Sequence, residues 1–458
     1  MAAERLIFGL GGPRASDRVE PGPAQADEDP PLVLDLSVDS AGGAKALRLL
    51  YDGAPGEEAA FGSLLSGRAP VIAVVDGTGQ VLAHGRPSVE TAESLTEAFE
   101  SVLGRAATVI DMALAKRAPA AAPVAQGAAG ACDWAAAARY AARTSAMTAV
   151  RYLYRLCTYS PHWRIGWRYV EGPGVLERGD FCGAPFRRIP DPGLRFYADP
   201  FPVSWRGQTS VFFEDFDHKT QKGVISAIPF DASGPTGGAR IVLETPWHLS
   251  YPFMMEHKGE LWMIPESSND KTVRLYRSTR FPDGWTEEAV LLQNVEAGDA
   301  TVTSFGGRLW MFAATRDGAG APSDTLSIYV ADEITGPWRP HAGNPILVDA
   351  ALARPAGAML ARNGRLLRPI QDCTSGYGRA ITIAEVTSLT EESFEQKVLS
   401  VLSPGPQWPG RRLHTLNRWG ALECIDGSAT SPRLLRPFAA RRGKDMPGAA
   451  SAASAASN

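Results

Sequence analysis

The sequence predicts a mainly β protein, a five-bladed β-propeller preceded by a small α/β domain and a linker helix. The main observation is a pattern that recurs five times between Tyr197 and Ile425. Each copy has a residue that opens a strand, an apolar run, a Gly about seven residues on, a second apolar run and a closing residue. The copies open at Asp199, Tyr251, Asp299, Ala356 and Arg412, and they turn at Gly207, Gly259, Gly307, Gly364 and Gly420. A hairpin repeated at roughly 45 to 60 residues has the period of a propeller blade.

Further strand-like segments support this fold class. Outer strand pairs follow the inner hairpins, at Val224–Phe230, Val273–Ser278, Leu326–Ala331 and Ala380–Glu385. The last hairpin has little sequence after it, so we expect the segment Trp163–Val170 to complete the last blade and close the ring. The propeller is therefore assigned to residues 161–430. Residues 431–458, which end in Ala/Ser repeats, are expected to be a disordered tail.

Residues 1–115 alternate strand and helix signals. Leu32–Leu36 and Val71–Val75 are apolar, β-branched-rich runs of the kind buried in a parallel sheet. A helix capped by Ser88 and ended by Gly104 is expected to follow. The region has no Gly-x-Gly-x-x-Gly and no Walker loop, so no nucleotide site is predicted.

Residues 116–160 are predicted to be an Ala/Pro-rich linker and a helix. A run of Ala, Pro and Gly precedes residue 131, and helical spacing then continues to Thr158. Two interpretations are open, a helix packed against a neighbouring domain and a helix on a membrane surface. The arginines at 139, 143, 151 and 155 are few and do not form one dense face, which favours packing.

Composition limits the functional classes. The formal net charge is -4 and there is no basic stripe, which argues against a nucleic-acid partner. The five cysteines are scattered without a Cys-x-x-Cys pair, so neither a disulfide scaffold nor a zinc site is expected. No signal peptide and no membrane-spanning run is found, so we expect a cytoplasmic protein without an integral membrane segment. No metal and no cofactor is predicted.

The hairpin geometry predicts where polar residues gather. Because the chain reverses at each Gly, the residues that open and close a hairpin lie at the same end of the blade. One rim is then acidic, with Asp199, Glu214, Asp215, Tyr251, Glu266, Asp299, Gln371, Asp372, His414 and Asp426. The opposite rim is basic, with Arg206, Lys258, Arg308 and Arg365. Since blades converge on a central axis, acids remote in sequence are expected to share one cavity.

Four motifs carry a family resemblance. Tyr197–Phe201, Phe213–Asp215, Trp247–Phe253 and Ile264–Ser267 resemble the N-terminal domain of plant glucosamine inositolphosphorylceramide transferases and its bacterial relatives. The match runs from about Trp163 to Ala429 and implies a five-bladed propeller related to furanosidase-type glycoside hydrolases. In the plant proteins a separate glycosyltransferase domain follows, and no such domain is expected within residues 1–458. Residues 1–115 look like a degenerate formyltransferase domain without its active-site motif, so formyl transfer is not predicted.

The resemblance also implies roles for acids on successive blades. Glycoside hydrolysis needs one carboxylic acid to protonate the leaving oxygen and one carboxylate to activate water or attack the sugar. By analogy Asp199 is the base, Glu266 the acid and Asp299 a modulator. The candidates for binding sugar hydroxyls or stacking on the ring are Glu214, Trp247, His248, Tyr251, Gln371, Asp372 and His414.

Three functions remain open at this point. The chain is an enzyme that cleaves or transfers a glycosidic linkage, or it is a non-catalytic carbohydrate-recognition domain that serves a glycosyltransferase or polysaccharide-assembly partner. A propeller that binds a protein through its basic rim is the third. The Asp-x-Asp at Asp215–Asp217 lies at the end of a hairpin strand, outside the α/β fold that gives this motif a metal-binding role, and is set aside.

Overall fold

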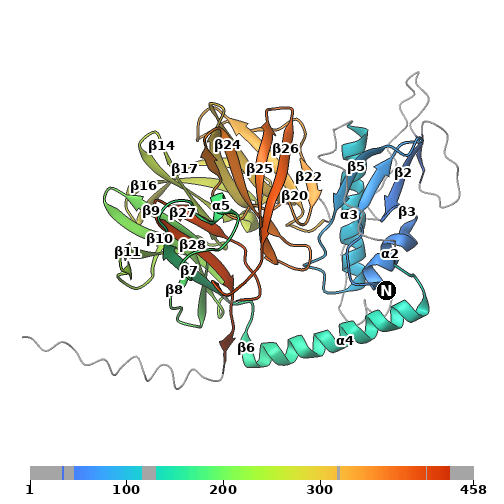
Figure 1. The fold of residues 1–458 in the computed structure, drawn as a ribbon, viewed down its shortest axis with the longest axis horizontal. Coiled ribbons are helices and arrows are strands. Elements are labelled where there is room, and N and C mark those ends of the chain that lie inside the picture. Colours follow the sequence, from blue (N-terminus) through green and yellow to red (C-terminus); the bar gives the residue numbers. More distant parts are fainter. Residues whose placement is uncertain (1–32, 36–45, 116–129, 317–319, 409, 434–458) are drawn as a thin grey trace, which may run out of the picture.

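The computed structural model describes residues 33–35, 46–115, 130–316, 320–408 and 410–433. It consists of a β-rich body, a smaller α/β unit and a long helix that runs along one side of both (Figure 1). The predictions for residues 1–32, for the linker at 116–129 and for the tail at 434–458 lie outside the described residues.

The mainly β prediction is confirmed, and the β-rich body has a propeller arrangement. Four separate sheets are blades, and three of them are built from consecutive antiparallel strands. The first contains β9 (Arg195–Trp205), β10 (Gln208–Asp217), β11 (Lys222–Asp231), β12 (Gly234–Pro235) and β13 (Arg240–Leu243). The second contains β14 (Ser250–His257), β15 (Glu260–Ser267), β16 (Thr272–Arg280) and β17 (Gly284–Gln293). Another contains β23 (Leu360–Arg362), β24 (Arg365–Asp372), β25 (Ala380–Leu389) and β26 (Phe394–Leu402).

The remaining blade closes the ring. It combines β27 (Leu416–Trp419) and β28 (Leu422–Ser428) with β7 (Trp163–Tyr169) and β8 (Arg187–Arg188). Strand β28 pairs with β7 from Leu422 opposite Tyr169 to Ser428 opposite Trp163. The expectation that a strand from before the first blade completes the last one is therefore confirmed. The short strands β6 (Thr158–Tyr159) and β29 (Ser431–Pro432) pair beside it, so the ordered chain extends slightly into the predicted tail.

The third hairpin repeat lies inside a larger sheet. Strands β18 (Glu296–Phe305), β19 (Arg308–Arg316), β20 (Thr325–Ala331), β21 (Arg339–Pro340) and β22 (Leu347–Asp349) repeat the blade order within a ten-stranded sheet. Strand β22 continues this sheet by pairing in parallel with β5 (Val81–Arg86) of the α/β unit. Gly85 permits the close approach, because a Cβ there would lie 2.9 Å from the Cβ of Val348.

The α/β unit differs from its prediction in detail. Besides β5 it has β1 (Val33–Asp35), β2 (Ala46–Tyr51), β3 (Ala54–Pro55) and β4 (Ile72–Val75), with helices α2 (Glu57–Leu65) and α3 (Leu95–Leu114). The sheet is mixed rather than parallel, because β2, β4 and β5 pair antiparallel. Helix α3 is capped by Ser94, not Ser88, and it continues through Gly104 because apolar residues keep their helical spacing as far as Ala113.

Buried charges hold the two units together. Arg105 of α3 donates from Nε to Asp324 Oδ1 over 2.8 Å, and both side chains have no solvent exposure. The second oxygen of Asp324 accepts the backbone N–H of Ser88 over 2.7 Å. Arg86 makes a bidentate pair with Asp349 at the edge where β5 meets β22. The α/β unit is therefore docked specifically on the third repeat.

Helix α4 (Trp134–Cys157) does not pack as expected. It begins at the N-cap Asp133, whose carboxylate accepts the backbone N–H of Ala136, and Ala136 is its only buried residue. The helix touches α2 near its start and then crosses open space to the propeller (Figure 1). Packing is thus limited to its first turns against the α/β unit and to its last turn, where Tyr154 meets Thr430. No described helix is long and apolar enough to cross a bilayer.

Candidate functional site at the acidic rim

The residue that opens each of three hairpins has a left-handed backbone conformation. Asp199, Tyr251 and Asp299 have φ values of 52°, 40° and 53°, in the left-handed region. In each case the pairing register of the hairpin shifts at this residue, which marks a bulge in the inner strand. A left-handed conformation is costly for residues other than Gly and is kept where the surroundings determine it. The equivalent positions of three repeats are therefore held in a strained geometry at the same rim.

Carboxylates connect the blades around the axis. Asp426 of the closing blade accepts the backbone N–H of Asp199 over 2.8 Å, and Asp199 accepts that of Tyr251 over 3.2 Å. Glu266 of the second blade accepts the N–H of Asp299 over 3.1 Å. Each bond satisfies the amide of a bulge residue with an acid from the preceding blade. The acids thus hold the ring together as well as forming its rim.

His414 lies between two carboxylates. Its Nε2 is 3.0 Å from Asp199 Oδ1, and its Nδ1 is 2.9 Å from Asp426 Oδ1. The Thr415 hydroxyl also donates to Asp199 Oδ1 over 2.6 Å, so both oxygens of Asp199 are occupied. One ligand atom from each of Asp199, His414 and Asp426 lies within 4.8 Å of the others, a spacing that suits a cation. Here the imidazole ring itself supplies the positive charge between the two acids.

The charge of His414 predicts a pH dependence of stability. Burial alone would lower the pKa of the imidazole, but the carboxylates of Asp426 and Asp199 outweigh it and raise the pKa well above its usual range. A raised folded-state pKa stabilises the fold fully below the unfolded value of about 6.5, and the contribution is lost as pH rises through the folded value. We expect the unfolding free-energy difference between the wild type and His414→Gln to be constant below this pH and to shrink at alkaline pH. A difference that grows with pH, measured by urea unfolding, would contradict the pairing.

Glu214 stands beside this cluster on β10. It is buried, and its Oε1 lies 3.4 Å from Nε2 of His248. Burial, and then the charge of Asp199, raises the pKa of Glu214 well above its usual range. Asp199 shifts the other way: burial would raise its pKa, but His414 and Thr415 outweigh that and lower it. Two neighbouring carboxyl groups thus favour different protonation states, with Glu214 neutral and Asp199 ionised.

A second cluster centres on Arg354. Its Nε donates to Asp299 Oδ2 over 2.6 Å and its Nη2 to Glu266 Oε2 over 3.3 Å. Gln371 donates to the same oxygen of Asp299 over 2.7 Å. Burial raises the pKa of Asp299 well above its usual range, and the charges of Glu266 and Asp199 add to this while Arg354 opposes it. The three predicted acids, Asp199, Glu266 and Asp299, therefore lie within electrostatic reach of one another.

Tyr377 is a rim residue that the sequence did not single out. Its half-buried ring lies over the Arg354 guanidinium, with 5.0 Å between the centroid and Cζ, and 5.1 Å from the ring of His414. Trp163 packs beside both rings, with centroid distances of 4.1 Å to His414 and 6.0 Å to Tyr377. The signal available was the segment Gly376-Tyr377-Gly378, where flanking glycines with φ of 107° and 66° let the chain present the ring.

Other predicted residues have structural surroundings. The ring of Tyr251 is fully buried and its hydroxyl is 2.8 Å from that of Thr301, so the expected stacking face is corrected to a core position. The bulge turns its side chain into the inter-blade core. Asp372 accepts from Thr374 and Arg379 of its own blade and stands apart from the cluster. Trp247 is half-buried beneath the Arg274 guanidinium, 5.0 Å from its ring centroid.

The α/β unit contributes one acid to the rim. Glu90 lies between β5 and α3, and neither carboxylate oxygen has a hydrogen bond of good geometry. Burial raises its pKa, while the Ser323 hydroxyl and the charge of Arg354 lower it. The docked unit therefore covers one side of the Arg354 cluster, a contribution that no local sequence pattern indicates.

Two cavities lie away from the centre of this cluster. One of about 540 Å³ borders Trp163 and Arg412 on the far side of His414, and one of about 290 Å³ lies near Glu177 and Arg418. The acidic cluster itself is closely packed. Its partly accessible side chains are those of His248 at 24%, Glu266 at 12%, and Glu214 and Arg354 at 9% exposure each, so a ligand would meet these groups first.

Comparison with known proteins points to one family. The family model for the N-terminal region of glucosamine inositolphosphorylceramide transferase 1 matches residues 190–420. Glucosamine inositolphosphorylceramide transferase 1 of Oryza sativa subsp. japonica is 34% identical over 232 residues, which cover 48% of this chain and 31% of the rice protein. The Arabidopsis thaliana protein of the same name is 33% identical over 234 residues, 50% of this chain and 30% of its own length. The chain thus matches less than a third of each relative.

Among solved structures, the chain is similar to the catalytic domain of the Coprinopsis cinerea GH62 alpha-L-arabinofuranosidase. The TM-score is 0.39 at 14% sequence identity, and the match covers 57% of this chain and 85% of that chain.

Proposed function

We propose that this chain, which belongs to the glucosamine inositolphosphorylceramide transferase 1 N-terminal family, is a carbohydrate-recognition protein that binds a sugar headgroup at the acidic rim of its propeller. The third hairpin repeat is counted as a blade, which makes five with the four separate sheets. A cytoplasmic location, a glycosyltransferase partner and a formyltransferase-like origin of residues 1–115 remain predictions.

The charge of the rim favours an amino sugar. Asp199, Asp426, Glu266 and Asp299 share two cations, His414 and Arg354, so three carboxylates still face two cations when Asp299 is neutral, as its raised pKa favours. The excess of negative charge attracts a protonated amine, and carboxylates also accept hydrogen bonds from sugar hydroxyls. The relatives' name joins glucosamine to an inositol phosphate lipid, a headgroup with both features. The observation that carries the proposal is that Glu214 and Glu266, from successive blades, are the partly accessible acids of the rim.

Recognition is favoured over cleavage by the state of Asp199. A general base needs a carboxylate oxygen within reach of the attacking water. Both oxygens of Asp199 already accept hydrogen bonds from protein donors, and the residue is only 3% exposed. In this setting Asp199 holds neighbouring blades together. Glu266 is the acid that binds the amine, and Glu214 and His248 bind sugar hydroxyls.

The amine preference is tested by calorimetric titration with methyl glucosaminide and its N-acetyl counterpart. At neutral pH we expect the free amine to bind about tenfold more tightly or better, since a charge-assisted hydrogen bond is worth more than a neutral one. Glu266→Gln should remove the preference, and Glu385→Gln, on an outer strand, should leave it unchanged. Equal binding of the two sugars by the wild type would contradict the proposed ligand class.

A second candidate function is cleavage of a glycosidic bond with Glu214 as the acid. It is favoured by the opposite protonation states of Glu214 and Asp199 on adjoining strands. In this case a chromogenic glucosaminide is hydrolysed by the wild type, and Glu214→Gln loses turnover but keeps binding. If the wild type binds the glucosaminide but releases no product, cleavage is contradicted and recognition remains the function.

A further inference from the structure

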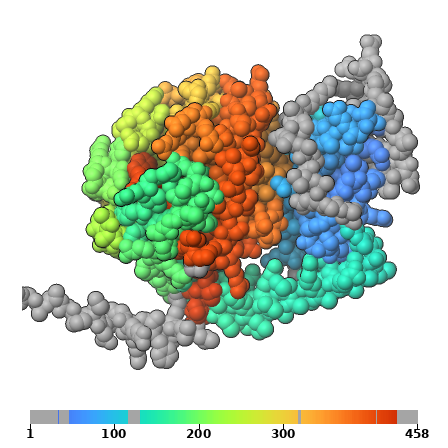
Figure 2. Space-filling view, in the orientation of Figure 1, coloured from blue at the N-terminus to red at the C-terminus, as the bar shows by residue number. Residues whose placement is uncertain are grey.

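Helix α4 presents an exposed surface that the proposed sugar site does not explain. Its ribbon spans the distance between the α/β unit and the propeller, and its surface forms the lower edge of the molecule (Figure 2). After Thr144 no residue of the helix is even half-buried. An exposed helix with large apolar side chains is rarely left without a partner in a soluble protein.

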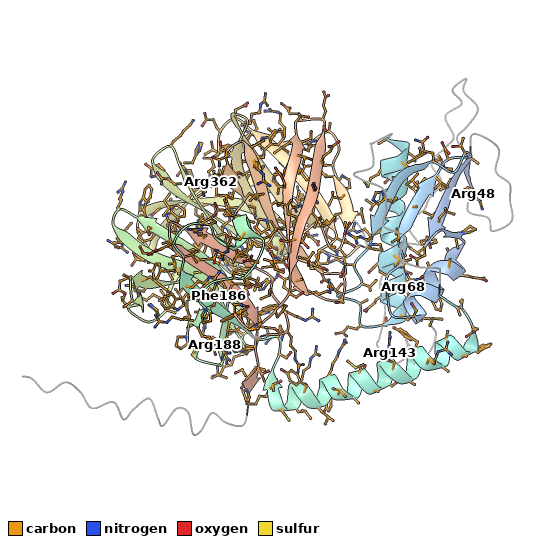
Figure 3. The ribbon with its side chains drawn as sticks, in the orientation of Figure 1. Arg48, Arg68, Arg143, Phe186, Arg188 and Arg362 are labelled. Atoms are coloured by element: carbon orange, nitrogen blue, oxygen red, sulfur yellow. The ribbon has the colours of Figure 1, made fainter. Side chains whose placement is uncertain are left out.

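The face that the helix turns toward the protein is narrow. Its buried or half-buried residues are Ala136, Ala137, Tyr140 and Thr144, which are spaced one, three and four apart and share one side. The Arg143 guanidinium also lies on this side, against Gly67 (Figure 3). The contact with the α/β unit ends within the first three turns, and near the other end Tyr154 Oη lies 3.3 Å from Thr430 Oγ1 of the propeller. Tyr154 lies on the same side of the helix as Ala136 and Tyr140, so the opposite side faces away from both units.

That outward side is apolar. With 3.6 residues per turn it carries Trp134, Ala138, Ala141, Ala142, Ala149, Tyr152, Leu153 and Leu156, and Ser145 is the polar residue among them. The large side chains on it are strongly exposed, Trp134 by 89%, Tyr152 by 64% and Leu153 by 61%. Trp and Tyr are the side chains that favour the boundary between water and lipid.

The charges of the helix are of one sign. Residues 134–157 contain four arginines and no acidic residue. Arg139 and Arg155 border the apolar side, and Arg151 lies further round. All three are exposed, and no ion pair involving them is found among the described residues. An apolar stripe flanked by arginines complements a surface with hydrocarbon below and negative charge above.

The cationic surface continues beyond the end of the helix. Tyr154 lines the cavity of about 540 Å³, together with Arg164, Arg188, Arg411 and Arg412, and none of its described lining residues is acidic. Arg188 lies on the side of the propeller nearest the C-terminal end of α4 (Figure 3). Trp408, 3% exposed, also lines the cavity, and its indole N–H has no acceptor. Arg164 is already paired with Asp191, and Arg412 donates to the carbonyls of Ser375 and Tyr377. Arg188 and Arg411 are therefore the guanidinium groups that this cavity offers to a phosphate.

We propose that α4 is an interfacial helix that docks this chain on a bilayer containing anionic phospholipids, with the arginine-lined cavity receiving a lipid phosphate. A second copy of the chain fits less well, because two such faces would bring arginines together without any acid of α4 to balance them. The inference is independent of the sugar site, since none of the residues that carry it belongs to the acidic cluster.

Vesicle sedimentation of the full chain tests the docking. The probes are vesicles of phosphatidylcholine alone and of equal parts phosphatidylcholine and phosphatidylglycerol. We expect binding to the mixed vesicles that falls with added salt, and weak binding to the neutral ones. The triple variant Tyr152→Ser, Leu153→Ser and Leu156→Ser should bind at least about tenfold more weakly, and so should Arg139→Gln, Arg151→Gln and Arg155→Gln together.

A matched control comes from exposed apolar residues on other elements. Ile241, Val398 and Val401 are 51%, 43% and 51% exposed on strands β13 and β26, and their replacement by Ser should leave vesicle binding unchanged. Circular dichroism and the melting temperature show whether each variant is folded, which is expected because the changed α4 side chains lack protein contacts. Equal binding of wild type and triple variant overturns the proposal. So does a dimer in sedimentation equilibrium that the triple variant dissociates, which would assign the face to self-association.

Discussion

Replacing Asp199 by Ala is expected to lower the free energy of unfolding of the propeller by about 3 to 5 kcal/mol. The change removes the acceptor for the Tyr251 amide and the Thr415 hydroxyl and leaves His414 with one of its two carboxylates. A buried charge without its partner is costly, and the orphaned donors add to the loss. Urea unfolding followed by tryptophan fluorescence measures the effect.

The matched control for Asp199 is Asp217→Ala on the same blade. Asp217 pairs with Arg195 while both side chains remain partly exposed, at 23% and 27%. An ion pair of this kind contributes up to about 1 kcal/mol. A loss at Asp199 no greater than the loss at Asp217 would contradict the role of Asp199 in joining the blades.

Replacing Arg105 by Leu is expected to cost a similar amount, about 3 to 5 kcal/mol, at the contact between the α/β unit and the third repeat. Asp324 would lose the guanidinium that faces it inside a fully buried pair, and the carbonyl of Ala321 would lose its donor. Burial already raises the pKa of Asp324 to about 6 with Arg105 present, so the acid is poorly tolerated without it. Limited proteolysis should then cut between the two units at lower denaturant concentrations.

The double variant Arg105→Leu with Asp324→Leu serves as the control. Replacing both members of a buried ion pair by apolar residues is often close to neutral, so much of the lost stability should return. If the double variant is as unstable as the sum of the single variants, the pair does not provide the contact between the units.

The repeat and the rim could be predicted from sequence because they depend on local spacing. The Gly between two apolar runs defined the hairpins. The lack of strand-like runs after the last hairpin indicated that Trp163–Val170 completes the last blade, as the pairing of β28 with β7 confirms. The four motifs indicated the family, which the family model confirms. Asp199, Glu214, Glu266, Asp299, Gln371 and His414 come together because they occupy equivalent ends of successive hairpins.

What could not be predicted depends on contacts between distant segments. Tyr251 has a left-handed backbone although it is not a glycine, so its sequence gives no sign of this conformation. The conformation places its ring in the core. Thr415 and Tyr377 reach the cluster from loops. Glu90 reaches the rim only because the α/β unit is docked through Arg105. Helix α4 is exposed because the parts of the α/β unit and of the propeller that it connects lie apart. The periodicity of its sequence carries no information about the distance between these two parts.

A thermodynamic cycle on amino-sugar binding tests whether acids from separate blades form one site. Calorimetric titration with methyl glucosaminide is compared for the wild type, Glu214→Gln, Glu266→Gln and the double variant, with melting temperatures as a check on folding. If both acids face one ligand, each single change weakens binding, and the two effects are coupled by roughly 0.5 to 3 kcal/mol. Binding that is unchanged in both single variants, or effects that add within about 0.5 kcal/mol, would contradict a shared site at the acidic rim.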